Sequence, residues 1–81
     1  MKDYMQLEII SPEKTLYAGE VEKVLLPGSK APFMVLANHA PMISLLQKGE
    51  IVWNTQSGES RIAVSGGVVE VKDNLITVCT E

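Results

Sequence analysis

The single histidine and the single cysteine, His39 and Cys79, are the residues of this chain best suited to acid–base or nucleophilic chemistry. A histidine that acts as a general base or metal ligand needs a positioned nucleophile, a second acid or further ligands. A Cys–His pair is formally possible, but neither flanking sequence resembles that of a thiol hydrolase. We therefore predict a turn or interface role for His39 and a small apolar role for Cys79.

Two other groupings have a chemical and a structural interpretation. Glu20 and Glu22 share one face of a predicted strand, and carboxylates at that spacing usually form a solvated edge. Gly66-Gly67 lacks the lysine and hydroxyl residue of a phosphate-binding loop, and no helical pattern follows it. We therefore predict that Gly66 and Gly67 form a structural turn between strands. The sequence predicts no catalytic residue, no metal site and no cofactor.

Composition limits both the size of the protein and its partners. The chain has 81 residues, which indicates one domain, 1–81, near the lower limit for a self-sufficient core. Its net charge of −3 and scattered basic residues argue against nucleic-acid binding. The N-terminal stretch predicts no signal peptide, and no segment approaches the roughly 20 apolar residues of a transmembrane helix. We expect association with a membrane only through a partner.

Hydrophobic alternation indicates an all-β fold. Met5–Ile10 is predicted to be a half-buried strand, and Thr15–Leu26 a long strand whose phase changes near Glu22-Lys23, as at a bulge or a bend between sheets. Short strands separated by turn signals predict a β-sandwich or flattened barrel of about eight to ten strands. Antiparallel pairing is expected throughout, because parallel pairing would need helical crossovers for which there is no room.

The alternation is interrupted most often between Pro27 and Met42. This stretch holds three of the four prolines and the only phenylalanine, Phe33. Proline cannot donate to a sheet ladder, so the stretch is confined to strand ends, edges and turns. A short strand, Phe33–Leu36, is predicted between two such breaks. We expect this corner to present the functional surface.

Four motifs, in this order, carry a resemblance to a known family. They are Ser11-Pro12 with Leu16-Tyr17-Ala18-Gly19-Glu20-Val21, then Val24-Leu25-Leu26-Pro27-Gly28, then His39-Ala40-Pro41-Met42, and finally Val64-Ser65-Gly66-Gly67-Val68-Val69-Glu70-Val71. Together with the intervening Lys48-Gly49, they resemble the N-terminal β-sandwich domain of the epsilon subunit of F-type ATP synthases. The resemblance covers nearly the whole chain and implies the same fold class as the alternation.

The resemblance also implies a function. In that family the subunit is non-catalytic and forms the central stalk with gamma, rotating with the c ring within the alpha/beta/gamma/delta/epsilon assembly. It couples ion translocation to ATP synthesis at the cytoplasmic face of the cell membrane. By resemblance, the residues expected to face gamma are His39, Ala40, Pro41, Met42, Ser44 and Leu45. Those expected to approach the c ring are Gly28, Ser29, Lys30, Ala31 and Pro32. Met42 and Leu45 are the expected gamma anchors, with Leu46 facing the core.

The chain departs from the family pattern in two ways. Pro32 and Met34 stand where many relatives have glutamate and glycine, and Ala37-Asn38 replaces a Pro-Gly pair before the histidine. We expect Asn38 to adopt the left-handed conformation that glycine would supply. Relatives continue into a C-terminal helical hairpin where this chain stops. If 81 residues is the natural length, as we expect, inhibition by helix extension does not occur. The alternative is a stand-alone module binding a peptide or small ligand at 33–42.

Overall fold

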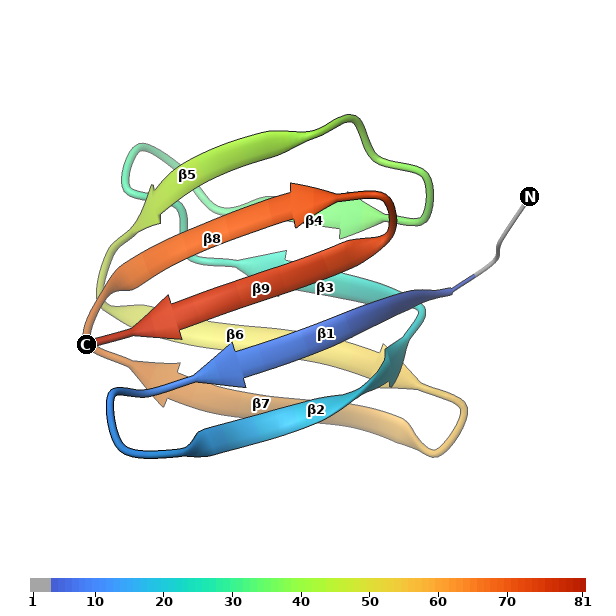
Figure 1. Ribbon diagram of the computed structural model, residues 1–81, viewed down its shortest axis with the longest axis horizontal. Helices are drawn as coiled ribbons and strands as arrows, with labels where there is room; N and C mark the ends of the chain where they lie inside the picture. Colours follow the sequence, from blue (N-terminus) through green and yellow to red (C-terminus); the bar gives the residue numbers. More distant parts are fainter. Residues whose placement is uncertain (1–3) are drawn as a thin grey trace.

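The computed structural model describes residues 4–81, which form two β-sheets packed face to face (Figure 1). The described residues contain nine strands and no helix, so the predicted all-β sandwich is confirmed. In chain order the strands are β1 (Met5–Ile10), β2 (Thr15–Val21), β3 (Lys23–Leu26), β4 (Phe33–Leu36), β5 (Met42–Leu46), β6 (Gly49–Thr55), β7 (Gly58–Val64), β8 (Gly67–Lys72) and β9 (Leu75–Thr80).

The five-stranded sheet has the order β2-β1-β9-β8-β5, and the four-stranded sheet has the order β4-β3-β6-β7. Every pair is antiparallel except β1 with β9, which run parallel over Gln6–Ile10 and Leu75–Cys79. The expectation of antiparallel pairing throughout was therefore wrong at this pair. A local helical crossover is needed only when parallel strands follow one another closely. Here the first and last strands pair, and all the strands between them supply the connection.

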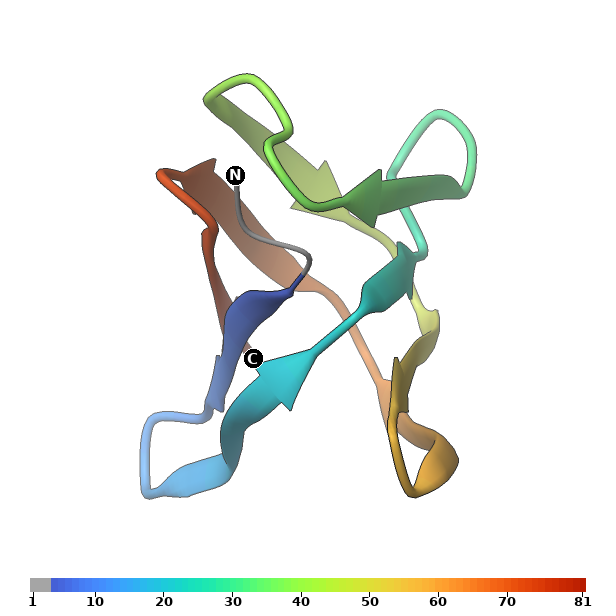
Figure 2. The ribbon, with the colours of Figure 1, turned by 90° about the vertical axis from the view of Figure 1, so that its right-hand side faces the viewer.

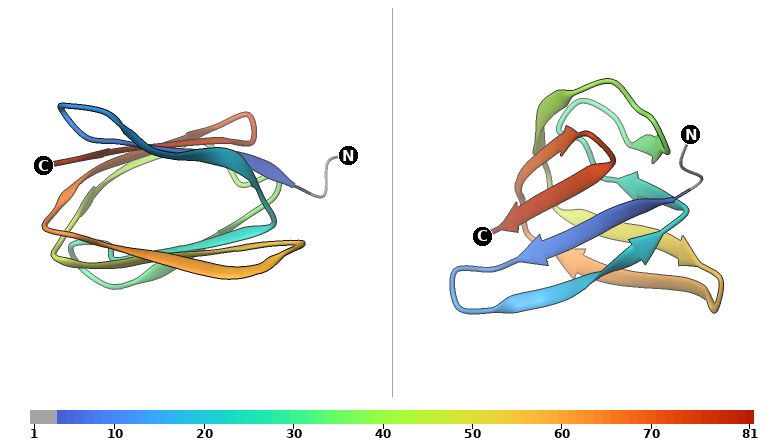
Figure 3. Two further views of the ribbon diagram at one scale, coloured as in Figure 1. Left: turned by 90° about the horizontal axis from the view of Figure 1, so that it is seen from below. Right: turned by 45° about the vertical axis from the view of Figure 1, so that its right-hand side comes forward.

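The core lies between the two sheets and is made of aliphatic side chains with one indole. Alternate residues of each strand point inward, as period-2 alternation requires. The buried apolar residues are Met5, Leu7, Ile9, Val21, Val24, Leu26, Val35, Leu46, Ile51, Trp53, Val64, Val69, Val71, Ile76 and Val78. The Tyr17 ring packs on Trp53 with centroids 4.6 Å apart. Seen from below, the two sheets form separate layers (Figure 3).

Consecutive strands change sheet at β2–β3, β4–β5, β5–β6 and β7–β8, and the sequence marks the first and the last of these crossings. At Glu22, β2 of one sheet continues directly into β3 of the other (Figure 2), so the predicted phase change is a bend between sheets. The Glu22 amide donates to the Asn54 carbonyl, 2.8 Å away, at this bend. At Gly66-Gly67, with φ of 154° and 149°, β7 leads into β8 of the other sheet. A Cβ at Gly67 would overlap the Cys79 carbonyl oxygen, so this position needs glycine.

Candidate interaction surfaces

Strand β5 is the element that connects the residues expected to bind partners. It is an edge strand of the five-stranded sheet, preceded by the 37–41 turn and flanked at its other end by the loop after β3 (Figure 1). Its side chains alternate between the two faces of the sheet. Leu45 points outward and is 62% exposed, whereas Leu46 is buried in the core as expected.

Met42, one of the two expected gamma anchors, points toward the core and not outward to a partner. Met42 shares the inward phase of Leu46, is half-buried and packs against the core. Ser44 has the same phase and is also half-buried. Ile43, which was not predicted as an anchor, is 72% exposed beside Leu45. The signal was present in the sequence: if Leu46 faces the core, then Ile43 and Leu45 must both face outward.

The register of the sheet extends this surface across four strands. Leu45 pairs with Val68, Val68 with Cys79, and Cys79 with Ile10. We call these four residues the apolar row. Leu45 and Cys79 are exposed, Val68 is 39% exposed and Ile10 is half-buried. With Ile43 beside it, the row forms a contiguous apolar patch on the outer face of the five-stranded sheet, the kind of patch that marks an interaction site.

The turn that carries His39 is held by a pair of side-chain amides. Asn38 has a φ of 67°, which confirms the predicted left-handed conformation. Its backbone amide donates to Asn74 Oδ1 at 2.6 Å, and Asn74 Nδ2 donates to Asn38 Oδ1 at 3.1 Å. Asn74 lies in the β8–β9 turn, so these bonds fix the 37–41 turn against that hairpin. No local sequence signal predicts this pairing, because the two residues lie 36 positions apart.

His39 is not part of a catalytic pair. It is half-buried, and its Nδ1 lies 2.7 Å from the Ala40 carbonyl, to which it donates. Cys79 is two strands away from β5, roughly 10 Å across the sheet. It is also aligned with Leu45, at the end of β5 remote from His39. The structure therefore does not form the Cys–His pair that the composition allowed. Ala40 and Pro41 are both exposed beside His39.

The loop expected to approach the c ring has one buried residue and four exposed ones. Gly28 is buried, and a Cβ there would lie 2.5 Å from the Ala31 carbonyl oxygen. Ser29, Lys30, Ala31 and Pro32 are exposed. The accessible part of this loop is thus 29–32, and Gly28 allows its close approach. The loop and the Met42–Leu45 part of β5 line a shallow hollow of about 480 Å³.

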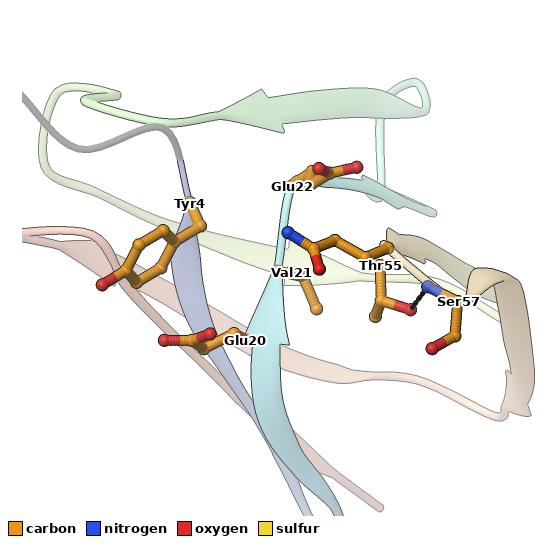
Figure 4. A pocket seen from close by; sticks show the side chains of 7 residues that line it. Tyr4, Glu20, Val21, Glu22, Thr55 and Ser57 are labelled. Atoms are coloured by element: carbon orange, nitrogen blue, oxygen red, sulfur yellow. Dashed lines mark hydrogen bonds between the residues drawn. The ribbon is translucent and has the colours of Figure 1, made fainter.

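The remaining polar groupings do not assemble a reactive site. Glu20 and Glu22 are exposed at the rim of a hollow of about 410 Å³, and in Figure 4 they extend to opposite sides of the ribbon. Arg61 contacts Glu59 at 2.6 Å and Glu50 at 3.1 Å. The hydrogen bond from Arg61 to Glu59, and then the charge of Glu50, raise the pKa of Arg61 above its ordinary value. Residues 4–81 contain no group of three or more His, Cys, Asp or Glu side chains that could hold a metal ion.

Comparison with known proteins identifies the class to which this sandwich belongs. Residues 4–81 match the family described as ATP synthase, Delta/Epsilon chain, beta-sandwich domain. The chain belongs to this family, which confirms the resemblance seen in its motifs.

The similar proteins include ATP synthase epsilon chains from several bacteria. The chain is 43% identical to that of Leptospira borgpetersenii over 79 residues, covering 95% of this chain and 61% of the relative. It is 37% identical to that of Maricaulis maris over 81 residues, covering 100% of this chain and 61% of the relative. The chain therefore spans about three-fifths of the length of these relatives.

Two solved structures share the fold at low sequence identity. A chain of the Euglena gracilis mitochondrial ATP synthase in rotational state 1 superimposes with a TM-score of 0.91 at 18% identity, covering 99% of this chain and 52% of that one. A chain in the central stalk and c ring of the Tetrahymena thermophila mitochondrial ATP synthase gives a TM-score of 0.75 at 15% identity, covering 94% and 62%. At these identities the comparison supports the fold alone.

Proposed function

We propose that this chain is a non-catalytic rotor subunit of an F-type ATP synthase, which binds gamma and the c ring and couples ion translocation to ATP synthesis. Its membership of the Delta/Epsilon chain β-sandwich family supports the subunit class. In this proposal the subunit lies at the cytoplasmic face of the membrane as part of the complex. The described residues contain no helix long and apolar enough to cross a membrane.

The observation that carries the proposed gamma contact is the exposed apolar patch of Ile43 and the apolar row. Ile43 and Leu45 are mostly exposed, so their side chains contribute little to the core of this domain. Interfaces are anchored by a few apolar side chains that become buried on association. The 37–41 turn borders the same strand, so gamma contacts at His39, Ala40 and Pro41 would be continuous with this patch. Ile43 thus replaces Met42 as a proposed anchor, and Leu45 is kept as the other.

Alanine substitution of the two anchors tests the gamma contact. Ile43→Ala and Leu45→Ala should each weaken gamma binding about fivefold or more, which corresponds to at least about 1 kcal/mol per anchor. Both variants should keep the wild-type unfolding midpoint. Leu36→Ala is the matched control, because Leu36 is a 54% exposed leucine on the other sheet. The affinities are measured by titration calorimetry with purified gamma.

Three outcomes would contradict this assignment. Equal loss of binding in Leu36→Ala would show that gamma does not select the five-stranded sheet. Unchanged affinity in Ile43→Ala and Leu45→Ala would move the contact elsewhere. A wild-type chain that binds neither gamma nor the c ring, yet shifts its melting temperature with a peptide or small ligand, would favour the stand-alone binding module. The hollow beside Phe33 and Met42 is where that ligand would bind.

A further inference from the structure

The loop between β3 and β4 is attached to the edge of the opposite sheet. Strands β3 and β4 belong to the four-stranded sheet, yet the start of their loop pairs with β5 of the five-stranded sheet. The Ser29 amide donates to the Leu45 carbonyl at 3.0 Å, and the Gln47 amide donates to the Pro27 carbonyl at 2.8 Å. An isolated bridge joins Gly28 and Leu46 between these two bonds. We call this set of contacts the clamp.

The clamp depends on close packing around two glycines, Gly28 and Gly49. A Cβ on Gly28 would lie 2.5 Å from the Ala31 carbonyl oxygen and 2.8 Å from the Phe33 ring. On the other side, a Cβ on Gly49 would lie 2.8 Å from the Pro27 ring. Because the Gly28 contact is to backbone, a methyl group there cannot be accommodated without moving the loop. Glycine at both positions lets the loop approach β5 closely enough for the clamp to form.

The clamp holds only one end of the loop. Beyond the bond between Ser29 and Leu45, the loop and the Met42–Leu45 part of β5 line a hollow of about 480 Å³. Residues 29–32 are exposed, so the loop contributes few buried apolar contacts of its own. A segment with few buried contacts and accessible backbone hydrogen bonds opens at a lower free energy than the core. We therefore expect the loop to open locally from its attached state into a detached one, with the clamp favouring the attached state.

Leu45 links the clamp to the apolar row. Its carbonyl oxygen accepts the Ser29 amide, while its side chain forms the exposed end of the row on β5. Detachment of the loop frees this carbonyl and the adjoining edge of β5. A partner that binds Leu45 in its clamped geometry therefore also favours the attached loop. Ligands shift such an equilibrium by the difference in their affinity for its two states.

We infer that the clamp couples the two proposed interfaces, so that gamma bound at the apolar row stabilises the 29–32 loop in the state that binds the c ring. This inference rests on the proposed function. It makes Gly28 a positioning residue, since it is buried and acts through the loop. Such coupling is reciprocal, so the c ring raises the affinity for gamma by the same factor.

Hydrogen exchange in the wild-type chain tests the coupling without any substitution. The amides of Ser29 and Gln47 are the two donors of the clamp, and their exchange is followed by NMR with and without saturating gamma. Both should slow together, by about fivefold or more. The Ser57 amide, which donates to Thr55 Oγ1 at 3.0 Å in the β6–β7 turn, is the control and should not change. Bound gamma with unchanged exchange at Ser29 and Gln47 would overturn the inference.

Variants on the two sides of the clamp test it through affinity. Gly28→Ala and Gly49→Ala should each weaken binding of both gamma and the c ring by about fivefold or more, although neither changes an exposed loop side chain. Lys30→Ala alters the loop surface but not the clamp, so it should leave gamma affinity unchanged. If Gly28→Ala does not fold, Gly49→Ala and the exchange experiment still decide the question.

The outcomes separate the clamp from the proposed function. Loss of c-ring binding in Gly49→Ala with wild-type gamma affinity would show a local loop effect and refute the coupling. Equal loss of gamma affinity in Lys30→Ala would show that gamma contacts the loop directly, which also refutes it. Failure of the wild-type chain to bind either partner would instead refute the proposed function itself.

Discussion

Substitution of Asn74 by glycine isolates the amide pair that holds the His39 turn. Asn74→Gly removes the acceptor for the Asn38 backbone amide and the donor to Asn38 Oδ1, and it leaves the backbone free to keep a φ of 62°. Asp73→Gly is the matched control. Asp73 has a φ of 51° in the same turn, and its side chain forms no hydrogen bond with the rest of the described chain. Both glycines relax the same left-handed strain and add similar freedom to the unfolded chain.

The difference in unfolding free energy between Asn74→Gly and Asp73→Gly therefore measures the contribution of the Asn38–Asn74 hydrogen bonds to stability. A neutral hydrogen bond contributes about 0.5–1.5 kcal/mol to stability, so two solvent-accessible bonds contribute about 1.5 kcal/mol. For a chain of 81 residues this corresponds to a melting temperature about 6–12 °C lower in Asn74→Gly than in Asp73→Gly. Fluorescence of Trp53, the single tryptophan and a buried one, reports urea unfolding of both variants.

Two results would refute this reasoning about the turn. Equal unfolding free energies for Asn74→Gly and Asp73→Gly, with equal m-values, would mean that the amide pair adds nothing to stability. A large loss in both variants would mean that the β8–β9 turn itself, rather than the pair, is disturbed. If the pair also positions His39 for gamma, Asn74→Gly should weaken gamma binding more than Asp73→Gly does.

Two further substitutions test the crossing between the sheets and the surface charges. Gly67→Ala should destabilise the domain by about 3 kcal/mol or more, because its Cβ would overlap the Cys79 carbonyl oxygen at a φ that alanine avoids; an unchanged urea midpoint would contradict this. Arg61→Ala should leave the thermal midpoint unchanged at physiological salt, because the pair is exposed. Since the pKa of Arg61 is raised, any contribution to stability is present below its ordinary pKa and is lost only as the pH rises past that value. Equal thermal midpoints of the wild type and Arg61→Ala at each pH from about 6 to 9 would support this prediction. A difference between the two midpoints that changes with pH in this range would contradict it.

Local sequence patterns determined most of the architecture. The strands were detectable because the alternation of apolar and polar residues that marks a strand lies within adjacent residues. The alternation of Met5, Leu7 and Ile9 identifies an inner face without reference to any other strand. The phase change at Glu22-Lys23 and the turn residues Asp73-Asn74 are likewise short-range signals, and both lie where the chain bends or reverses. The motifs around His39 and Gly66-Gly67 are also runs of adjacent residues, so they indicate the family without any knowledge of the strand pairing.

Contacts between distant residues were decided by the tertiary structure. The parallel pairing of β1 with β9, the Asn38–Asn74 amides and the Gly28–Leu46 bridge each join parts of the chain whose local sequences contain no mark of the partner. The register of the strands, and the attachment of the β3–β4 loop to edge strand β5, depend on how the two complete sheets pack their apolar faces together. The sequence therefore determined the strands, the turns and the family. Alternation puts Ile43 and Leu45 on one face of β5 and Met42 and Leu46 on the other, and the packing of the two sheets decided which of these faces is the inner one: Ile43 and Leu45 face outward, while Met42 packs against the core.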